Sequence, residues 1–143
     1  MRPMWILTVA LTLPASPAVA QSPAVTHIDS GKVAAALAGG GPLVATKDFT
    51  IAGSHRVGPG QVEVHDRETD IFYVTDGEAT LVTGGTMVGG KQTAPGQHRG
   101  TDIKGGRATT LKKGDVVTIP AGVPHWFKDV SPSVSYLTVK VIR

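Results

Sequence analysis

Four residues with metal-binding side chains lie in two short stretches of the sequence. Glu63 and His65 are separated by one residue, Asp70 follows soon after, and His125 comes much later. Imidazole and carboxylate groups together suit divalent iron, manganese, zinc, nickel or cobalt, and the chain has no cysteine that could supply a thiolate. The chemical question is whether these four side chains converge on a metal ion or face water.

The first stretch has the pattern of two short strands. Residues 62–65 alternate apolar and polar, so Glu63 and His65 are predicted to share one face of a strand. The run from Ile71 to Val74 is β-branched and aromatic, and Asp76-Gly77 after it is a strong hairpin-turn signal. Asp70 enters this second strand on the face of Phe72, whereas Tyr73 points to the other side.

The second stretch places a histidine directly after a rigid turn. Val116–Ile119 reads as a buried strand, and Pro120-Ala121-Gly122 makes a turn that leads into the next strand at His125. By strand alternation Phe127 shares the face of His125, and Trp126 points away. The direction of the histidine side chain is therefore strongly restricted.

Most of the remaining chain reads as short strands separated by glycine and proline, which predicts an all-β sandwich or barrel. The one convincing helix is short, with Asp29-Ser30 as its cap and Gly39-Gly40-Gly41 as its end. The other predicted strands are Leu43–Thr46, Phe49–Ala52, Ala79–Thr83 and a long final strand at Val134–Ile142.

One segment departs from this pattern. Residues 84–106 are rich in glycine and poor in apolar residues, and they form an unusually long connection for a small domain. We predict a glycine-rich loop insertion there. His98 and Arg99 lie within it, either exposed on a flexible loop or folded over the mouth of the barrel.

The first twenty residues have the features of a secretory signal peptide. Arg2 precedes an apolar run, and Ala18-Val19-Ala20 fits a small-residue cleavage site. The alternative of a membrane anchor is disfavoured because the run is far shorter than the ~20 residues of a spanning helix. Cleavage after Ala20 would leave 123 residues, one ordinary domain, in the periplasm or outside the cell without a membrane attachment.

The charge pattern argues against a nucleic-acid partner. The formal net charge is +3, but the basic residues are scattered and no aromatic platform interleaves with them. A weak attraction for a small anion remains, and Lys47 and Arg56 are candidates to meet one, although the sequence pattern does not fix their direction. His27 and His55 have no motif partners and are predicted to be solvated.

In the two stretches that contain the candidate ligands, the sequence resembles the cupins, a family of small jelly-roll β-barrels. Their second motif is Gly, five residues, Pro, one residue, Gly, two residues, His, three residues and Asn. Gly114, Pro120, Gly122 and His125 match it, and Asp129 stands in place of the Asn. Their first motif, His-x-His followed after four residues by Glu, corresponds in spacing to Glu63, His65 and Asp70, with two ligand identities changed.

The resemblance covers roughly residues 46–143 and implies a single cupin-type jelly-roll barrel there. It leaves residues 21–45 as an N-terminal arm with the short helix. It also implies that one divalent metal ion (Fe, Mn, Zn, Ni or Co) is bound by Glu63, His65, Asp70 and His125. Glu68 would replace Asp70 if the strand register were shifted. Because buried carboxylates are costly without a cation, the pattern itself favours a metal over an inward-facing pair of bare acids.

Two classes of function fit this ligand set. One is a metal-dependent oxygenase, lyase or isomerase that acts on a small polar or acidic molecule held at the metal. The other is a non-catalytic module that binds a metal or small ligand, or serves as a dimeric scaffold, since one fold hosts many functions. No catalytic residue beyond the ligands is identified. A homodimer is implied by the resemblance alone.

Overall fold

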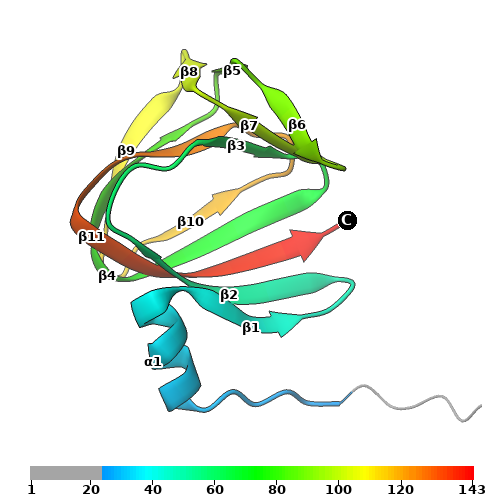
Figure 1. Cartoon of the computed structure of the whole chain (residues 1–143), viewed down its shortest axis with the longest axis vertical. Coiled ribbons are helices and arrows are strands. Elements are labelled where there is room, and N and C mark those ends of the chain that lie inside the picture. The colour runs from blue at the N-terminus through cyan, green and yellow to red at the C-terminus, as the bar shows by residue number, and fades with distance from the viewer. Residues whose placement is uncertain (1–23) are drawn as a thin grey trace, which may run out of the picture.

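The computed structural model describes residues 24–143, so the predicted signal peptide at residues 1–20 lies outside the described residues. One helix and eleven strands follow one another along the chain: α1 (Ser30–Gly39), β1 (Gly41–Ala45), β2 (Phe49–Arg56), β3 (Val62–His65), β4 (Glu68–Thr83), β5 (Thr86–Val88), β6 (Lys91–Ala94), β7 (Gln97–Gly100), β8 (Asp102–Lys104), β9 (Arg107–Lys112), β10 (Val116–Ile119) and β11 (His125–Ile142). Figure 1 shows these strands curving around a common interior.

Two long antiparallel strands, β4 and β11, organise the fold. They pair along almost their whole length, from His125 opposite Thr83 to Ile142 opposite Glu68. Bulges interrupt this register on both sides of Val130, and bulges let strands bend as a closed barrel requires. β2 pairs with the second half of β11, while β9 and β10 pair with the two halves of β4. The predicted all-β jelly roll is confirmed.

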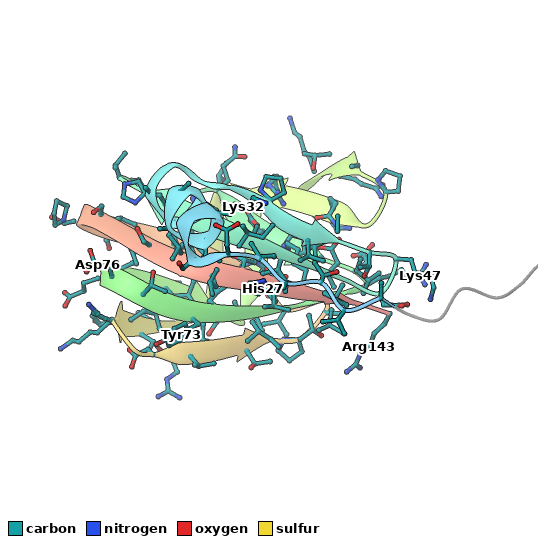
Figure 2. The ribbon with its side chains drawn as sticks, turned by 90° about the horizontal axis from the view of Figure 1, so that it is seen from below. His27, Lys32, Lys47, Tyr73, Asp76 and Arg143 are labelled. Carbon is teal, nitrogen blue, oxygen red and sulfur yellow. The ribbon has the colours of Figure 1, made fainter. Side chains whose placement is uncertain are left out.

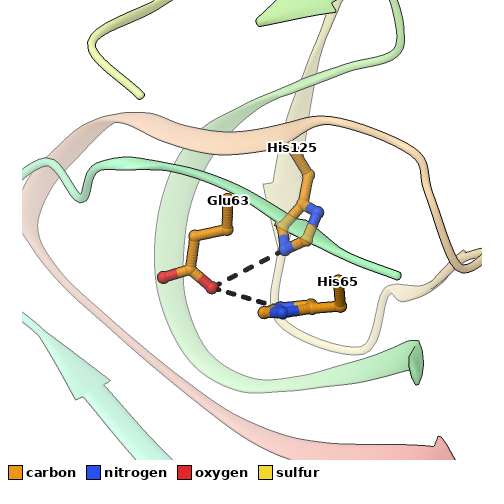
Figure 3. A group of neighbouring side chains, drawn as sticks. All are labelled: Glu63, His65 and His125. Carbon is orange, nitrogen blue, oxygen red and sulfur yellow. Dashed lines mark ion pairs between the residues drawn. The ribbon is translucent and has the colours of Figure 1, made fainter. Parts of the chain in front are cut away.

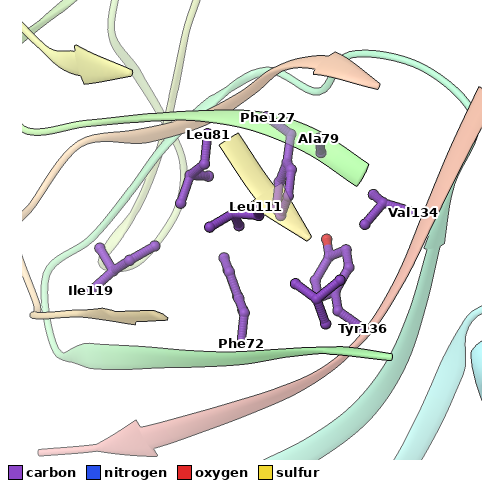
Figure 4. Packing of buried hydrophobic residues seen from close by; sticks show 9 residues of the cluster. Phe72, Ala79, Leu81, Leu111, Ile119, Phe127, Val134 and Tyr136 are labelled. Atoms are coloured by element: carbon purple, nitrogen blue, oxygen red, sulfur yellow. The ribbon is translucent and has the colours of Figure 1, made fainter. Parts of the chain in front are cut away.

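The barrel encloses an apolar cluster in its interior, shown in Figure 4. Phe72, Phe127 and Tyr136 form its aromatic centre, with ring centroids 4.9–5.6 Å apart. Seven of its nine buried members come from β4 and β11, where they follow the period-two pattern on each side of the bulges. The buried members of the apolar cluster are Phe72, Val74, Ala79, Leu81, Leu111, Ile119, Phe127, Val134 and Tyr136.

The predicted short helix is present and packs on β2 (Figure 1). The Asp29 side chain caps it by accepting a hydrogen bond from the Lys32 backbone amide. The helix backbone at Ala36 lies so close to Gly53 of β2 that a Cβ on Gly53 would overlap the Ala36 carbonyl group. Gly53 is therefore required for this contact. Within residues 24–143, no helix is long and apolar enough to cross a membrane.

The prediction of a loop at residues 84–106 is wrong, because most of this segment forms strands. This segment contains four short strands, of which β7 pairs with both β3 and β6, and β5 pairs with β8. It extends the sheet next to the strand that carries Glu63 and His65. The four residues of β6 are all exposed, so the segment carries no alternating apolar pattern that a sequence interpretation could detect. The domain limits at 21–45 and 46–143 stay predictions.

The parity of the strands around the first stretch agrees with the sequence interpretation. Asp70 and Phe72 of β4 are buried, whereas Tyr73 is 46% exposed. Figure 2 labels Tyr73 on this side of the molecule. In β11, His125 and Phe127 are buried in the same way, and Trp126 packs on the opposite side in a small cluster with Val62, Val82 and Ile103. The four candidate ligands are thus positioned by ordinary strand alternation.

Candidate metal centre

The four predicted ligands come from three strands that meet at one end of the barrel. Glu63 and His65 lie on β3, Asp70 on β4, and His125 is the first residue of β11, directly opposite Glu63 in the ladder. His65, Asp70 and His125 are each 2–3% exposed, and Glu63 is partly buried. Figure 3 shows the Glu63 carboxylate facing both imidazoles, with a dashed line to each. We refer to these four residues as the ligand group.

Both imidazoles direct Nε2 at the carboxylates. His65 Nε2 lies 3.4 Å from Glu63 Oε2 and 3.4 Å from Asp70 Oδ2. His125 Nε2 lies 3.8 Å from Glu63 Oε2 and 3.5 Å from Asp70 Oδ2. These separations are long for hydrogen bonds. They match the ~3.4 Å between two ligand atoms that each lie about 2.1 Å from one tetrahedral ion.

The turn before β11 sets the orientation of His125. His125 Nδ1 lies 3.1 Å from the Val123 carbonyl and donates its proton there, so Nε2 is the ring nitrogen that faces the carboxylates. In residues 24–143, His125 Nε2 is the one fully buried side-chain nitrogen or oxygen that lacks a hydrogen-bond partner. Gly122, at φ 80°, donates its N–H to the His65 carbonyl and so ties this turn to β3. A buried, unpartnered imidazole nitrogen that faces carboxylates fits the donor set of a cation site.

Gln97 on β7 sets the orientation of His65. Its side-chain carbonyl accepts from His65 Nδ1, while its amide nitrogen donates to Glu68 Oε1 at 3.0 Å. His65 Nε2 is therefore the nitrogen available to a metal. Glu68, the alternative to Asp70, also lies close, with Oε2 3.7 Å from His65 Nδ1. That nitrogen is already used by Gln97, so the geometry favours Asp70 as the ligand on the Nε2 side.

Lys140 of β11 brings a cation of its own to the ligand group. Its ammonium lies 2.8 Å from Asp70 Oδ1, 2.9 Å from His65 Nε2 and 3.1 Å from Glu68 Oε2. A divalent ion bound by His65 would compete with the Lys140 ammonium for the same lone pair.

The pKa values of the ligand group follow from its mixture of burial and opposite charge. Burial raises the pKa of the Glu63 carboxyl, but the two imidazoles and Arg99 outweigh burial and hold that pKa well below its usual range. For the Asp70 carboxyl, burial likewise raises the pKa, and the two imidazoles and Lys140 outweigh it. Burial lowers the pKa of His65, but Asp70 and Glu63 raise it to about 9. The pKa of His125 is raised for the same reason.

Sequence comparison identifies the family. A family model described as Cupin matches residues 58–141, more than half of the chain. The chain belongs to the cupin family. A search among curated proteins finds no sequence that matches it.

Solved structures share the cupin fold at low sequence identity. TT1209 from Thermus thermophilus is 18% identical, with a TM-score of 0.52 over 71% of this chain and 80% of that one. KdgF from Halomonas sp. is 17% identical, with a TM-score of 0.52 over 72% and 78%. Peruvianin-I, a cysteine peptidase from Thevetia peruviana latex, is 17% identical, with a TM-score of 0.46 over 66% of this chain. The chain spans about half of Peruvianin-I, 51% of its length.

A cavity of about 240 Å³ adjoins the ligand group inside this cupin. Residues of the four strands β2, β3, β4 and β11 line most of it. β2 contributes Thr50, Ala52, Ser54 and Arg56, and β11 contributes Tyr136, Thr138 and Lys140, together with Glu63, Asp70 and His125 of the ligand group. The candidate metal centre is thus placed in the wall of a space that a small molecule can enter.

The other polar residues singled out in the sequence fall into two groups. Arg99 and His98 lie on β7, which pairs with β3, and not on a flexible loop. Arg99 lies 3.6 Å from Glu63, and His98 lies 2.9 Å from Asp66. Lys47 pairs with its neighbour Asp48 in an exposed position. His27 and His55 are at least partly exposed, as expected, although His55 hydrogen-bonds Ser135.

Sequence reasoning did not identify Gln97 or Lys140. Lys140 carried a usable signal, because it shares strand parity with the buried residues Val134, Tyr136 and Thr138. Arg56 carried no such signal, because the apolar residues Phe49 and Ile51 lie at the opposite parity of β2. Gln97 carried none, because its contact with His65 spans 32 residues and depends on how β7 pairs with β3.

Proposed function

We propose that this cupin is a metal-dependent enzyme, an oxygenase, lyase or isomerase, that acts on a small polar or acidic molecule. One divalent metal ion (Fe, Mn, Zn, Ni or Co) would be bound by Glu63, His65, Asp70 and His125. The observation that supports this most strongly is the buried Nε2 of His125, which faces two carboxylates and has no hydrogen-bond partner among the described residues.

The residues of the chain prepare such a site for a cation. Val123 and Gln97 hold the two imidazoles with Nε2 inward, so neither ring must rotate when an ion binds. Glu63 and Asp70 supply two negative charges that balance a divalent ion. When bound, the ion would polarise an oxygen of the substrate and stabilise negative charge that develops on it. The adjoining cavity gives that substrate a place beside the ligand group.

A non-catalytic metal-binding or ligand-binding module is the second candidate. The observation that favours it is the poor supply of proton acceptors around the cavity. Apart from the ligand group, the titratable residues that line it are Arg56, Tyr136 and Lys140. Burial, with the nearby Glu63 charge, raises the pKa of Tyr136, so this phenol stays protonated at neutral pH. An enzyme would therefore depend on the metal or on Lys140 for proton transfer.

The first experiment is elemental analysis of protein purified without a nickel column. The parent should contain about one divalent metal ion per chain, and the variants Glu63→Ala and His125→Ala should lose it. His55→Ala is the matched control, because His55 is an exposed histidine outside the ligand group. A parent that holds no metal and shows no thermal shift with any of the five ions would refute the metal site.

Turnover separates the two candidate functions once a metal is found. The metal-loaded protein would be incubated with a panel of small hydroxy, keto and dicarboxylic acids, with and without O₂. Product formation that disappears in His125→Ala supports an enzyme. Binding without turnover across the whole panel supports the module.

We also propose that the protein is exported to the periplasm or secreted after cleavage behind Ala20, and that it forms a homodimer. Mass spectrometry of protein from the periplasmic fraction should find Gln21 as the first residue. For the dimer, β1 is at one end of the sheet order and presents a strand edge to which a second copy can pair. Light scattering coupled to size exclusion measures the assembly directly.

A further inference from the structure

Arg56 lies in the wall of the cavity and has no ion-pair partner among the described residues. It is the last residue of β2 and lines the same cavity as Glu63, Asp70 and His125. Its Nε donates to the Tyr136 hydroxyl at 2.8 Å, and its guanidinium carbon lies 5.0 Å from the centre of the Phe127 ring. Among residues 24–143, no carboxylate lies within ion-pair distance of this guanidinium. Its position is fixed, but its charge is uncompensated.

The environment of Arg56 leaves most of its hydrogen-bonding groups unused. A guanidinium has five N–H donors, and within the described residues only Nε has an acceptor. Gly60 gives the terminal nitrogens their space, because a Cβ on Gly60 would lie 2.8 Å from Arg56 Nη1. The two terminal nitrogens form the planar fork that binds a carboxylate through two parallel hydrogen bonds.

The charges around the cavity favour an anion. Arg56 and Lys140 contribute two positive charges, and Glu63 and Asp70 contribute two negative charges. These charges cancel, so a divalent ion at the ligand group would leave the cavity with an excess of about two positive charges. A ligand that carries one or two negative charges would restore the balance, and charge interactions in a partly enclosed cavity are stronger than in bulk water.

We propose that Arg56 is the anion-recognition residue of the cavity, and that the ligand is a compact carboxylate with a second oxygen function at its other end. Its carboxylate binds the Arg56 fork, and its second oxygen faces the ligand group. The second part of this assignment rests on the proposed metal site, whereas the Arg56 subsite does not.

The size and polarity of the cavity narrow the ligand further. A space of about 240 Å³ holds on the order of eight waters, so the ligand has roughly that many non-hydrogen atoms. Between Arg56 and Lys140 the wall carries hydroxyls, with Ser54 Oγ and Thr138 Oγ1 3.1 Å apart. These hydroxyls suit a polar backbone in the ligand, as in a small dicarboxylic, hydroxy or keto acid.

The test uses dicarboxylates of increasing length and uncharged analogues of the same size. Malonate, succinate and glutarate, and the corresponding diamides, would be titrated by calorimetry into protein loaded with Mn²⁺ and freed of excess ion. The parent should bind at least one dicarboxylate about tenfold more tightly than its diamide. Arg56→Gln should reduce that affinity about tenfold or more, because it removes a charged bidentate contact.

Two further variants separate recognition from folding and from general charge. Arg56→Lys keeps the charge but not the fork, and should give an intermediate affinity with an unchanged melting temperature. Arg107→Gln removes an exposed arginine on β9 and should bind like the parent. Equal affinity for dicarboxylate and diamide in the parent, or unchanged dicarboxylate affinity in folded Arg56→Gln, would overturn the proposal.

Metal content distinguishes this proposal from the proposed function. Arg56→Gln should retain the metal of the parent, because the hydrogen bond of Arg56 goes to Tyr136 and not to the ligand group. If the parent binds no metal, the metal-free protein is titrated with propionate and propionamide. Arg56-dependent preference for propionate would then support the anion subsite while the metal site fails. Absence of that preference would overturn both.

Discussion

The interior of the barrel has two regions that are built by the same strands but hold opposite kinds of side chain. Along β4, Asp70 of the ligand group is followed at alternate positions by Phe72 and Val74 of the apolar cluster. Along β11, His125 is followed by Phe127 in the same way. Core and site therefore share one register, and a shift of one residue in either strand would lose both.

The two regions differ in what keeps their side chains in place. The apolar cluster is stabilised by packing, which tolerates small adjustments between neighbours. The ligand group is held by directional contacts from outside itself, namely Val123 to His125 and Gln97 to His65. Changes in the first region should therefore act on folding, and changes in the second on metal binding.

The largest effect is expected on the free energy of unfolding when a residue of the apolar cluster is changed. Leu81 is 1% exposed in the apolar cluster and does not line the cavity, so Leu81→Ala should lower the free energy of unfolding by about 2–5 kcal/mol. Metal content at a temperature where the variant is folded should equal that of the parent. Chemical denaturation and elemental analysis check the two statements, and a joint loss of metal in the folded variant would break the separation.

The reverse separation is expected for His125→Ala. Loss of one ligand imidazole should reduce metal affinity by about 100-fold or more, while the metal-free protein still folds. The measurement is competition with a chelator of known affinity. Metal binding as tight as that of the parent would exclude His125 as a ligand.

The pH dependence of the metal-free protein tests the charges in the ligand group. The pKa of His65 is raised to about 9 in the folded state from 6.5, so its stabilising contribution is complete below pH 6.5 and is lost as pH rises through 9. Stability should fall by on the order of 2 kcal/mol over that interval. Thermal melts at pH 6 to 9.5 measure it, and His65→Gln should flatten the curve. A parent whose stability rose with pH would contradict this account.

A smaller effect is expected when the support of a ligand is removed. Gln97→Ala leaves all four ligands but frees the His65 ring, so metal affinity should fall about 10- to 100-fold with little change in stability. Gln92→Ala, at an exposed position on β6, is the control. Equal metal affinity in the two variants would show that β7 has no part in the site.

The smallest expected effect has the opposite sign. Lys140→Met removes the ammonium that contacts His65 and Asp70, so metal affinity should rise about tenfold. The metal-free variant should at the same time become less stable, because two carboxylates lose their cation. Lys104→Met, an exposed lysine on β8, controls for net charge. A fall in metal affinity would instead make Lys140 a supporting residue of the bound state.

The directions of the four candidate ligands could be predicted because short-range rules fix them, whereas the hairpin turn predicted at Asp76-Gly77 is wrong, since β4 continues through it from Glu68 to Thr83. The alternation in residues 62–65 and the turn before His125 determine directions without knowledge of distant contacts. Applied to β2, the same rule would have placed Arg56 outward, because the apolar Phe49 and Ile51 occupy the other face of that strand. Whether these ligands bind a metal stays a prediction.

The segment at residues 84–106 could not be predicted because its strands lack a regular buried face. The outward residues of β6 and the pairing of β7 with β3 depend on the finished sheet. Gln97 contacts His65 only because of that pairing, so no local sequence pattern predicts the contact. The missing information is tertiary rather than local.

Strand β2 has a consequence for how this protein can evolve. Its inward residues Thr50, Ala52, Ser54 and Arg56 line the cavity, yet none belongs to the ligand group. Substitutions at these alternate positions would change the shape and polarity of the cavity and leave all four candidate ligands in place. Descendants of one ancestral barrel can in this way acquire different cavities through changes in a single strand.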